Sequence, residues 1–144
     1  MSDLLSDVGA ERAVLAGLFK FGLESYVEIS DIIDHKTFAH SNNQILYKCV
    51  QRILEGGSEV DVPSILSAAS QLKFSEVVNS QQELQYIKSL FDFPVKQENV
   101  LNFAVQIKKF ELARRIKSLV KNISKEADAI DGTESVDEIL SLIE

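Results

Sequence analysis

An uninterrupted helical stretch near the carboxyl end is the feature that most constrains how this chain can fold. Residues 99–132 contain no proline, and their only glycine is the last residue, Gly132. They predict one continuous helix from about Glu98 to Ile130, which would measure about 50 Å at about 1.5 Å per residue. A compact domain of this chain length has a radius of gyration near ~15 Å, hence a diameter of roughly 40 Å. We therefore expect part of the helix to extend beyond the globule formed by the preceding residues.

The long helix has two apolar faces when successive residues are placed about 100° apart. One face runs along the whole helix and contains Leu101, Val105, Leu112, Ile116, Leu119, Ile123 and Ile130. The opposite face is apolar only in the first half of the helix, where we expect it to dock on the globule through Val100, Phe103, Ile107 and Phe110. In the second half the opposite face becomes basic, with Arg114, Lys117, Lys121 and Lys125.

A second, shorter helix is predicted after Gly132, and the short connection predicts that it folds back as an antiparallel hairpin. Its apolar pattern is still continuing where the sequence stops at Glu144, so we expect the chain to be a piece of a longer protein. We interpret the hairpin as a surface for self-association. The alternative is a kink near Lys108 and Lys109 that would fold the second half of the long helix back onto the globule. The predicted subunit contact consists of Leu112, Ile116, Leu119, Val120, Ile123, Ile139, Leu140 and Ile143.

The rest of the sequence predicts an all-α fold, because helical periodicity recurs and strand-like alternation is almost absent. Residues 1–9 predict a flexible amino-terminal arm, residues 10–96 a helical globule, and residues 97–144 the hairpin. Within the globule, Asp61 and Ser80 occur where helix N-caps are expected, and Gly56 and Gly57 end a helix. A turn over residues 34–41 is expected to place Phe38 in the core.

Composition limits the classes of function. Apolar residues make up 45% of the chain and charged residues 26%, which is typical of a globular protein. A single cysteine, Cys49, excludes an internal disulfide, and no secretion signal or membrane span is visible, so we expect a cytoplasmic protein. The net charge of −7 disfavours direct, strong DNA binding, because affinity for DNA depends largely on neutralising phosphates.

The charge is unevenly distributed along the sequence. Residues 108–125 contain seven basic residues and one acid, a balance of +6, whereas residues 126–144 contain seven acids and no base, a balance of −7. The basic residues of the long helix could contact nucleic acid, or they could form the solvated face of an amphipathic helix. The second interpretation is favoured, because no aromatic residue or flexible glycine lies nearby to stack on a base.

No catalytic or metal-binding pattern is recognisable. The six glycines form no phosphate-binding loop. His35 and His40 are five residues apart in a predicted turn with no cysteine pair nearby, which disfavours a metal site. Cys49 lies in a helical pattern typical of a packing residue. We expect no catalytic residue, cofactor or metal in this segment.

The order of elements resembles the N-terminal domain of DnaB-like replicative helicases, including phage-encoded versions. The resemblance covers about residues 8–144 and depends on the order and spacing of five weak motifs. They are "AERAVLAGLF", "ISDIIDHKTFAHSNNQILYKCVQRILEGG", "SEVDVPSILSAASQL", "NVLNFAVQIKKFELARRIKSL", which carries a central arginine at Arg114 or Arg115, and "SVDEILSLIE". Ala16, where the family usually has glycine, and Tyr47 depart from the family pattern without breaking a helix.

The resemblance implies a collar above a hexameric motor ring, in which hairpins of neighbouring subunits pair as a ring of three dimers. It also implies that the collar binds a primase or a helicase loader. ATP and magnesium would bind a motor domain that follows this segment. Two alternatives remain at this point: a helicase-binding adaptor domain of a primase or another replisome protein, and a small helical DNA-binding protein.

Overall fold

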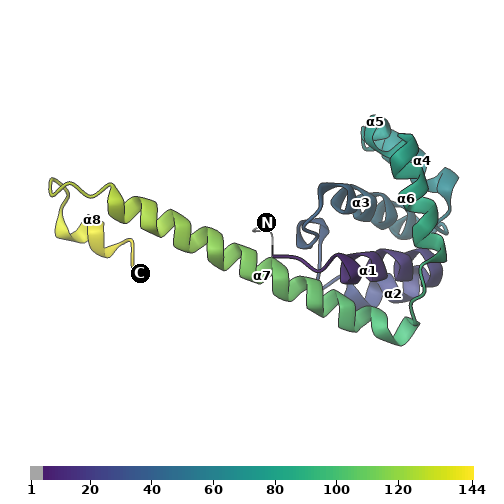
Figure 1. Ribbon diagram of the computed structural model, residues 1–144, viewed down its shortest axis with the longest axis horizontal. Helices are drawn as coiled ribbons and strands as arrows, with labels where there is room; N and C mark the ends of the chain where they lie inside the picture. Colours follow the sequence, from purple (N-terminus) through teal and green to yellow (C-terminus); the bar gives the residue numbers. More distant parts are fainter. Residues whose placement is uncertain (1–4) are drawn as a thin grey trace. The chain divides into compact units, whose positions relative to one another are not determined.

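The computed structural model of the chain describes residues 5–144, and every regular element in this range is a helix (Figure 1). The all-α prediction is therefore confirmed. The described residues divide into two compact units, one ending at Glu111 and the other spanning Leu112–Glu144. We call them the N-terminal unit and the C-terminal unit. The helices are α1 (Val8–Phe21), α2 (Leu23–Ile29), the short 3-10 helix η1 (His35–Thr37), α3 (Ser41–Glu55), α4 (Val62–Gln71), α5 (Ser75–Val78), α6 (Gln81–Asp92), α7 (Gln97–Asp128) and α8 (Val136–Leu140).

Two boundaries differ from those expected. Residues 1–4 of the predicted arm lie outside the described residues, and α1 begins at Val8, so the end of the predicted arm is helical. The Asp7 carboxylate caps this helix by accepting a hydrogen bond of 2.9 Å from the backbone N–H of Ala10. The second difference is that the two compact units divide within α7, after Glu111, and not before the helix at residue 97.

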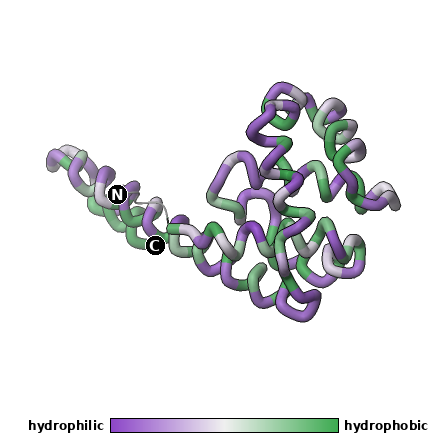
Figure 2. The backbone as a smooth tube through the Cα atoms, turned by 45° about the vertical axis from the view of Figure 1, so that its right-hand side comes forward, coloured by the Kyte–Doolittle hydropathy of each residue, from purple (hydrophilic) through white to green (hydrophobic). Residues whose placement is uncertain are grey.

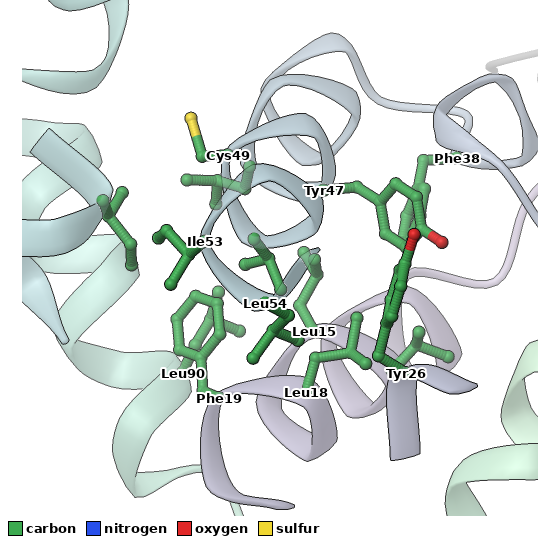
Figure 3. Close-up of a cluster of buried hydrophobic side chains, with 14 of the residues drawn as sticks. Leu15, Leu18, Phe19, Tyr26, Phe38, Tyr47, Cys49, Ile53, Leu54 and Leu90 are labelled. Atoms are coloured by element: carbon green, nitrogen blue, oxygen red, sulfur yellow. The ribbon is translucent and has the colours of Figure 1, made fainter. Parts of the chain in front are cut away.

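The core of the N-terminal unit is built around α1, whose side chains from Val14 to Leu18 are almost fully buried. Side chains of α3 and α6 complete this core around it, as the close-up in Figure 3 shows. Two aromatic contacts reinforce it: the rings of Phe19 and Phe91 lie 4.6 Å apart, and those of Phe38 and Tyr47 lie 5.3 Å apart. Such ring pairs add stability beyond the area that they bury.

The turn between α2 and α3 places Phe38 in this core, as the sequence predicts, with its side chain fully buried. A buried carboxylate fixes the turn: Glu11 accepts hydrogen bonds from the backbone N–H of Ala39 at 2.9 Å and from Nδ2 of Asn43 at 2.8 Å. Oδ1 of Asn43 in turn accepts a hydrogen bond of 2.6 Å from the hydroxyl of Tyr86. This polar chain connects α1, α3 and α6, and the sequence alone gave no sign of it.

Gly17 of α1 lies against the side chain of Val100 of α7 within the N-terminal unit. A Cβ atom added at Gly17 would lie 2.5 Å from Cγ2 of Val100, a separation that real side chains do not tolerate. Glycine in a helix interior costs roughly 0.5–1 kcal/mol relative to alanine. The contact with Val100 explains why glycine is present in spite of that cost.

We expect Gly17→Ala to lower the free energy of unfolding by about 1–2 kcal/mol, because overpacking outweighs the gain in helix propensity. Chemical denaturation followed by circular dichroism measures the change. The matched control is the same substitution in a Val100→Ala background, where the space is free and Gly17→Ala should be neutral or stabilising. Equal effects in both backgrounds would contradict the assigned contact.

The predicted N-caps are present. The side chain of Asp61 accepts a hydrogen bond of 2.8 Å from the N–H of Ser64, and that of Ser80 accepts one of 3.2 Å from the N–H of Glu83. The Glu83 side chain does not return to the cap, although its spacing from Ser80 fits a capping box. Its Oε1 accepts a weak hydrogen bond of 3.4 Å from Asn42, while Oε2 is buried with no hydrogen-bond partner among the described residues.

Burial raises the pKa of Glu83, and the hydrogen bond from Asn42 offsets this only in part. At neutral pH the folded protein therefore carries a carboxylate that is less stable than the same group in the unfolded chain. As the pH falls through the raised pKa, the folded state takes up the proton first and the penalty disappears. Below the unfolded value of about 4.3 the penalty is absent.

We expect Glu83→Gln to stabilise the protein at pH 7 by up to about 1 kcal/mol, because the amide keeps the size of the side chain and removes the charge that burial disfavours. The difference from the parent should shrink towards zero below about pH 4. Thermal unfolding of both proteins between pH 4 and pH 8 measures it. A constant difference across that range would show that ionisation of Glu83 is not the cause.

Candidate functional site

The first half of α7 packs into the N-terminal unit. Val100, Ala104 and Ile107 are almost fully buried in the core, and Phe103 is half-buried and packs against it. Phe110, the last residue of the predicted docking face, is half-buried. The sequence analysis did not include Ala104 in the docking face, because alanine is common on both buried and exposed helix faces. Its spacing from Val100 and Ile107 is nevertheless helical.

Glu111 continues this buried face at the end of the N-terminal unit. Its Oε1 accepts hydrogen bonds of 2.9 Å from the hydroxyl of Thr37, which is fully buried, and from the ammonium group of Lys108. These contacts connect α7 to the η1 turn that precedes Phe38. Sequence reasoning missed Glu111, because a charged side chain is expected to be solvated even where its helical spacing places it on the buried face.

In the C-terminal unit the second half of α7 exposes large apolar side chains. Ile116 is 62% exposed, Leu119 59% and Val120 62%, while Leu112 and Ile123 are less exposed but still open to solvent. Figure 2 shows hydrophobic and hydrophilic residues alternating along this part of the chain. A contiguous apolar strip of this kind on a helix is typical of a protein interface.

The chain reverses direction after α7 and runs back as the short helix α8 (Figure 1). Gly132 permits the reversal with a φ angle of 93°, a conformation that favours glycine. The Ser135 side chain caps α8 by accepting a hydrogen bond of 3.1 Å from the N–H of Glu138. The helix ends at Leu140, so the predicted second helix is present but shorter than its apolar pattern suggested.

The reversal brings the last apolar residues of the chain into the same unit as the second half of α7. Ile139 is half-buried, Leu140 is 44% exposed and Ile143 is 78% exposed. The predicted contact residues therefore share one compact unit, and most of them are open to solvent. We call this set the hairpin face: Leu112, Ile116, Leu119, Val120, Ile123, Ile139, Leu140 and Ile143.

The sequence of the N-terminal unit matches a known protein family. The family model for the DnaB-like helicase N terminal domain matches residues 3–109. The chain belongs to this family. The match ends shortly before Leu112, so the hairpin face lies outside the matched residues. Comparison of the sequence with curated proteins finds no match.

A solved structure supports the same fold for this DnaB-like domain. The N-terminal domain of DnaB helicase from Mycobacterium tuberculosis is similar with a TM-score of 0.76, over 95% of this chain and 92% of that chain. The two sequences are only 17% identical, so the similarity concerns the fold. Because the alignment covers nearly the whole chain, it includes most of the C-terminal unit.

The basic face predicted for the second half of α7 is mostly exposed to solvent. Lys117, Lys121 and Lys125 are exposed, and Arg114 is half-buried. In the described part of the chain no carboxylate lies within 4.0 Å of the three lysines. They are available to water or to a partner.

Other groups that could carry chemistry are dispersed. No group of three or more His, Cys, Asp or Glu side chains that could hold a metal ion occurs among residues 5–144. The Cys49 thiol is buried, and burial raises its pKa to about 11, so it is an unreactive packing residue. Nε2 of His40 is buried without a partner among the described residues. Within the same range no helix is long and apolar enough to cross a membrane.

Proposed function

We propose that this domain is the collar of a ring-shaped, hexameric replicative DNA helicase and that it mediates subunit association through the hairpin face. The observation that carries the proposal is the set of large, solvent-exposed apolar side chains in the C-terminal unit. Membership of the family places the domain in a helicase. Burial of the hairpin face between subunits would stabilise their association.

The charges of the C-terminal unit favour an antiparallel arrangement of two copies. Its first part, residues 112–125, contains five basic residues and no acid, and residues 126–144 contain seven acids and no base. If two hairpins align in opposite directions, the basic part of each lies near the acidic part of the other. In a parallel alignment like charges would face each other, which destabilises a contact.

Within this proposal the domain binds proteins and contributes no catalytic group. ATP and magnesium would be bound by a motor domain outside these residues, and a primase or a helicase loader would bind the collar. The net charge of −7 argues against strong DNA binding by the domain alone. A salt-sensitive shift of DNA by the purified domain would contradict that part of the proposal.

The test of self-association is the molar mass of the 144-residue chain, measured by light scattering over a concentration series at moderate salt. We expect a dimer or a larger, even-numbered assembly that dissociates on dilution. Raising the salt concentration should weaken it, because part of the attraction is between exposed charges. A monomer at every concentration would refute self-association through the hairpin face.

A further inference from the structure

The short helix α2 in the N-terminal unit exposes two large apolar side chains to solvent. Its buried side contributes Tyr26 and Ile29 to the core. On the other side Leu23 is 50% exposed and Val27 is 63% exposed. These two side chains are four residues apart, so they are neighbours on the helix surface and form one apolar strip.

A pocket of about 430 Å³ adjoins the strip. Phe21 and Leu23 line it where α1 turns into α2, and Leu54 and Val60 line it from the end of α3 and the loop that follows. The pocket is therefore partly apolar, and the α2 strip continues it along the surface. A strip and a pocket of this kind can receive the side chains of a packed helix, as in ridges-into-grooves packing.

Acidic side chains surround the apolar surface. Glu24 and Glu28 are exposed on α2 next to Leu23 and Val27, Asp31 is exposed just after the helix, and Glu59 lines the pocket. Lys20 also lines the pocket and donates a hydrogen bond of 2.6 Å to the carbonyl of Phe93; it keeps its positive charge, but the four carboxylates outnumber it. The surface thus combines exposed apolar groups with a negative field, which attracts cationic partners.

We propose that this α2 surface, formed by Leu23, Val27, Glu24, Glu28 and the adjoining pocket, is a docking site for a basic amphipathic helix of a partner protein. Apolar side chains of the partner would enter the pocket and cover the strip, and its lysines or arginines would face the carboxylates. The inference rests on the proposed function in one respect, that a collar domain receives a partner protein. It uses none of the residues of the hairpin face.

The test uses a 14-residue helical peptide made of leucine and lysine, with the leucines spaced to form one face, and a matched peptide with glutamate in place of lysine. Binding is followed by amide NMR shifts of the full 144-residue chain. We expect the lysine peptide to shift residues 21–28 and 57–60 and the glutamate peptide to bind at least tenfold more weakly. Shifts concentrated in the acidic residues 126–144 would overturn the proposal.

Two pairs of exposed residues provide the variants. Leu23→Ser with Val27→Ser, and Glu24→Lys with Glu28→Lys, should each weaken peptide binding about tenfold or more. The matched control is Glu76→Lys with Val77→Ser on α5, where an acidic residue also adjoins a partly exposed apolar side chain. This control should bind the peptide like the parent. Equal losses in the control and the α2 variants would overturn the assignment.

The same variants separate this inference from the proposed function. Light scattering should give Leu23→Ser, Val27→Ser the same molar mass as the parent. A lower mass would show that a second copy of the chain occupies the α2 surface, which would overturn the proposal of a separate partner. A parent chain that is monomeric would refute self-association while leaving the peptide experiment decisive for α2.

Discussion

The variant carrying Ile116→Asp and Leu119→Asp is expected to be monomeric at concentrations where the parent chain is associated. Both side chains are about 60% exposed and lie on the hairpin face. In a symmetric dimer each substitution occurs twice, so four apolar side chains lose their contact. Burial of such a side chain contributes about 1.5–3 kcal/mol, so even partial burial implies at least a hundredfold increase in the dissociation constant.

The matched control changes the charge by the same amount on another face of the same helix. Ser118→Asp with Lys121→Gln also lowers the net charge by two units, and both residues are exposed. This variant should keep its assembly, apart from a modest electrostatic weakening. Light scattering measures the association of both variants, and circular dichroism checks that both remain helical. Loss of association in both would indicate an effect of net charge, and loss in neither would place the contact elsewhere.

Phe38→Ala is expected to cause the largest loss of stability in the N-terminal unit. The side chain is fully buried, packs against the Tyr47 ring and belongs to a turn that Glu11 fixes by hydrogen bonds. Replacing a buried phenylalanine by alanine costs about 3–5 kcal/mol, a large part of the about 5–15 kcal/mol that stabilises a typical protein.

Denaturant unfolding followed by circular dichroism measures this loss. Phe38→Leu is the control, because it keeps most of the apolar volume and should cost less than half as much. Ala129→Gly at an exposed position just after α7 should change little. A loss below about 1 kcal/mol for Phe38→Ala would contradict the role of this side chain as a central core residue.

The sequence was informative wherever a local rule determines the structure. The absence of helix breakers predicted α7, and the N-cap residues Asp61 and Ser80 predicted the starts of α4 and α6. The apolar face of the second half of α7 was also predictable, because helical spacing depends only on neighbouring residues. The residues of the hairpin face were therefore predictable from the sequence, and their role in association remains a prediction.

The sequence was uninformative where the hydrogen-bond partner of a buried polar residue lies far away along the chain. Glu11 bonds to Ala39, 28 residues away, and Glu111 bonds to Thr37, 74 residues away. The helical spacing of both glutamates places them on buried faces, but their charge suggests a solvated position, and only the folded chain reveals their partners. The helix α8 ends at Leu140 although the apolar pattern continues beyond it, because an apolar pattern indicates a face but a short helix needs a packing partner to persist.

The division of the chain within α7 has a consequence for how this single helix is stabilised. Up to Glu111 the helix is stabilised by tertiary burial, whereas residues 112–128 expose nearly every side chain. The second half of α7 therefore has little tertiary burial to stabilise it and continues a helix that is anchored at one end only. If the hairpin face associates as proposed, its burial would add stability to this half, and the helical content of the chain should rise with its concentration. Helicity measured by circular dichroism would then report on assembly.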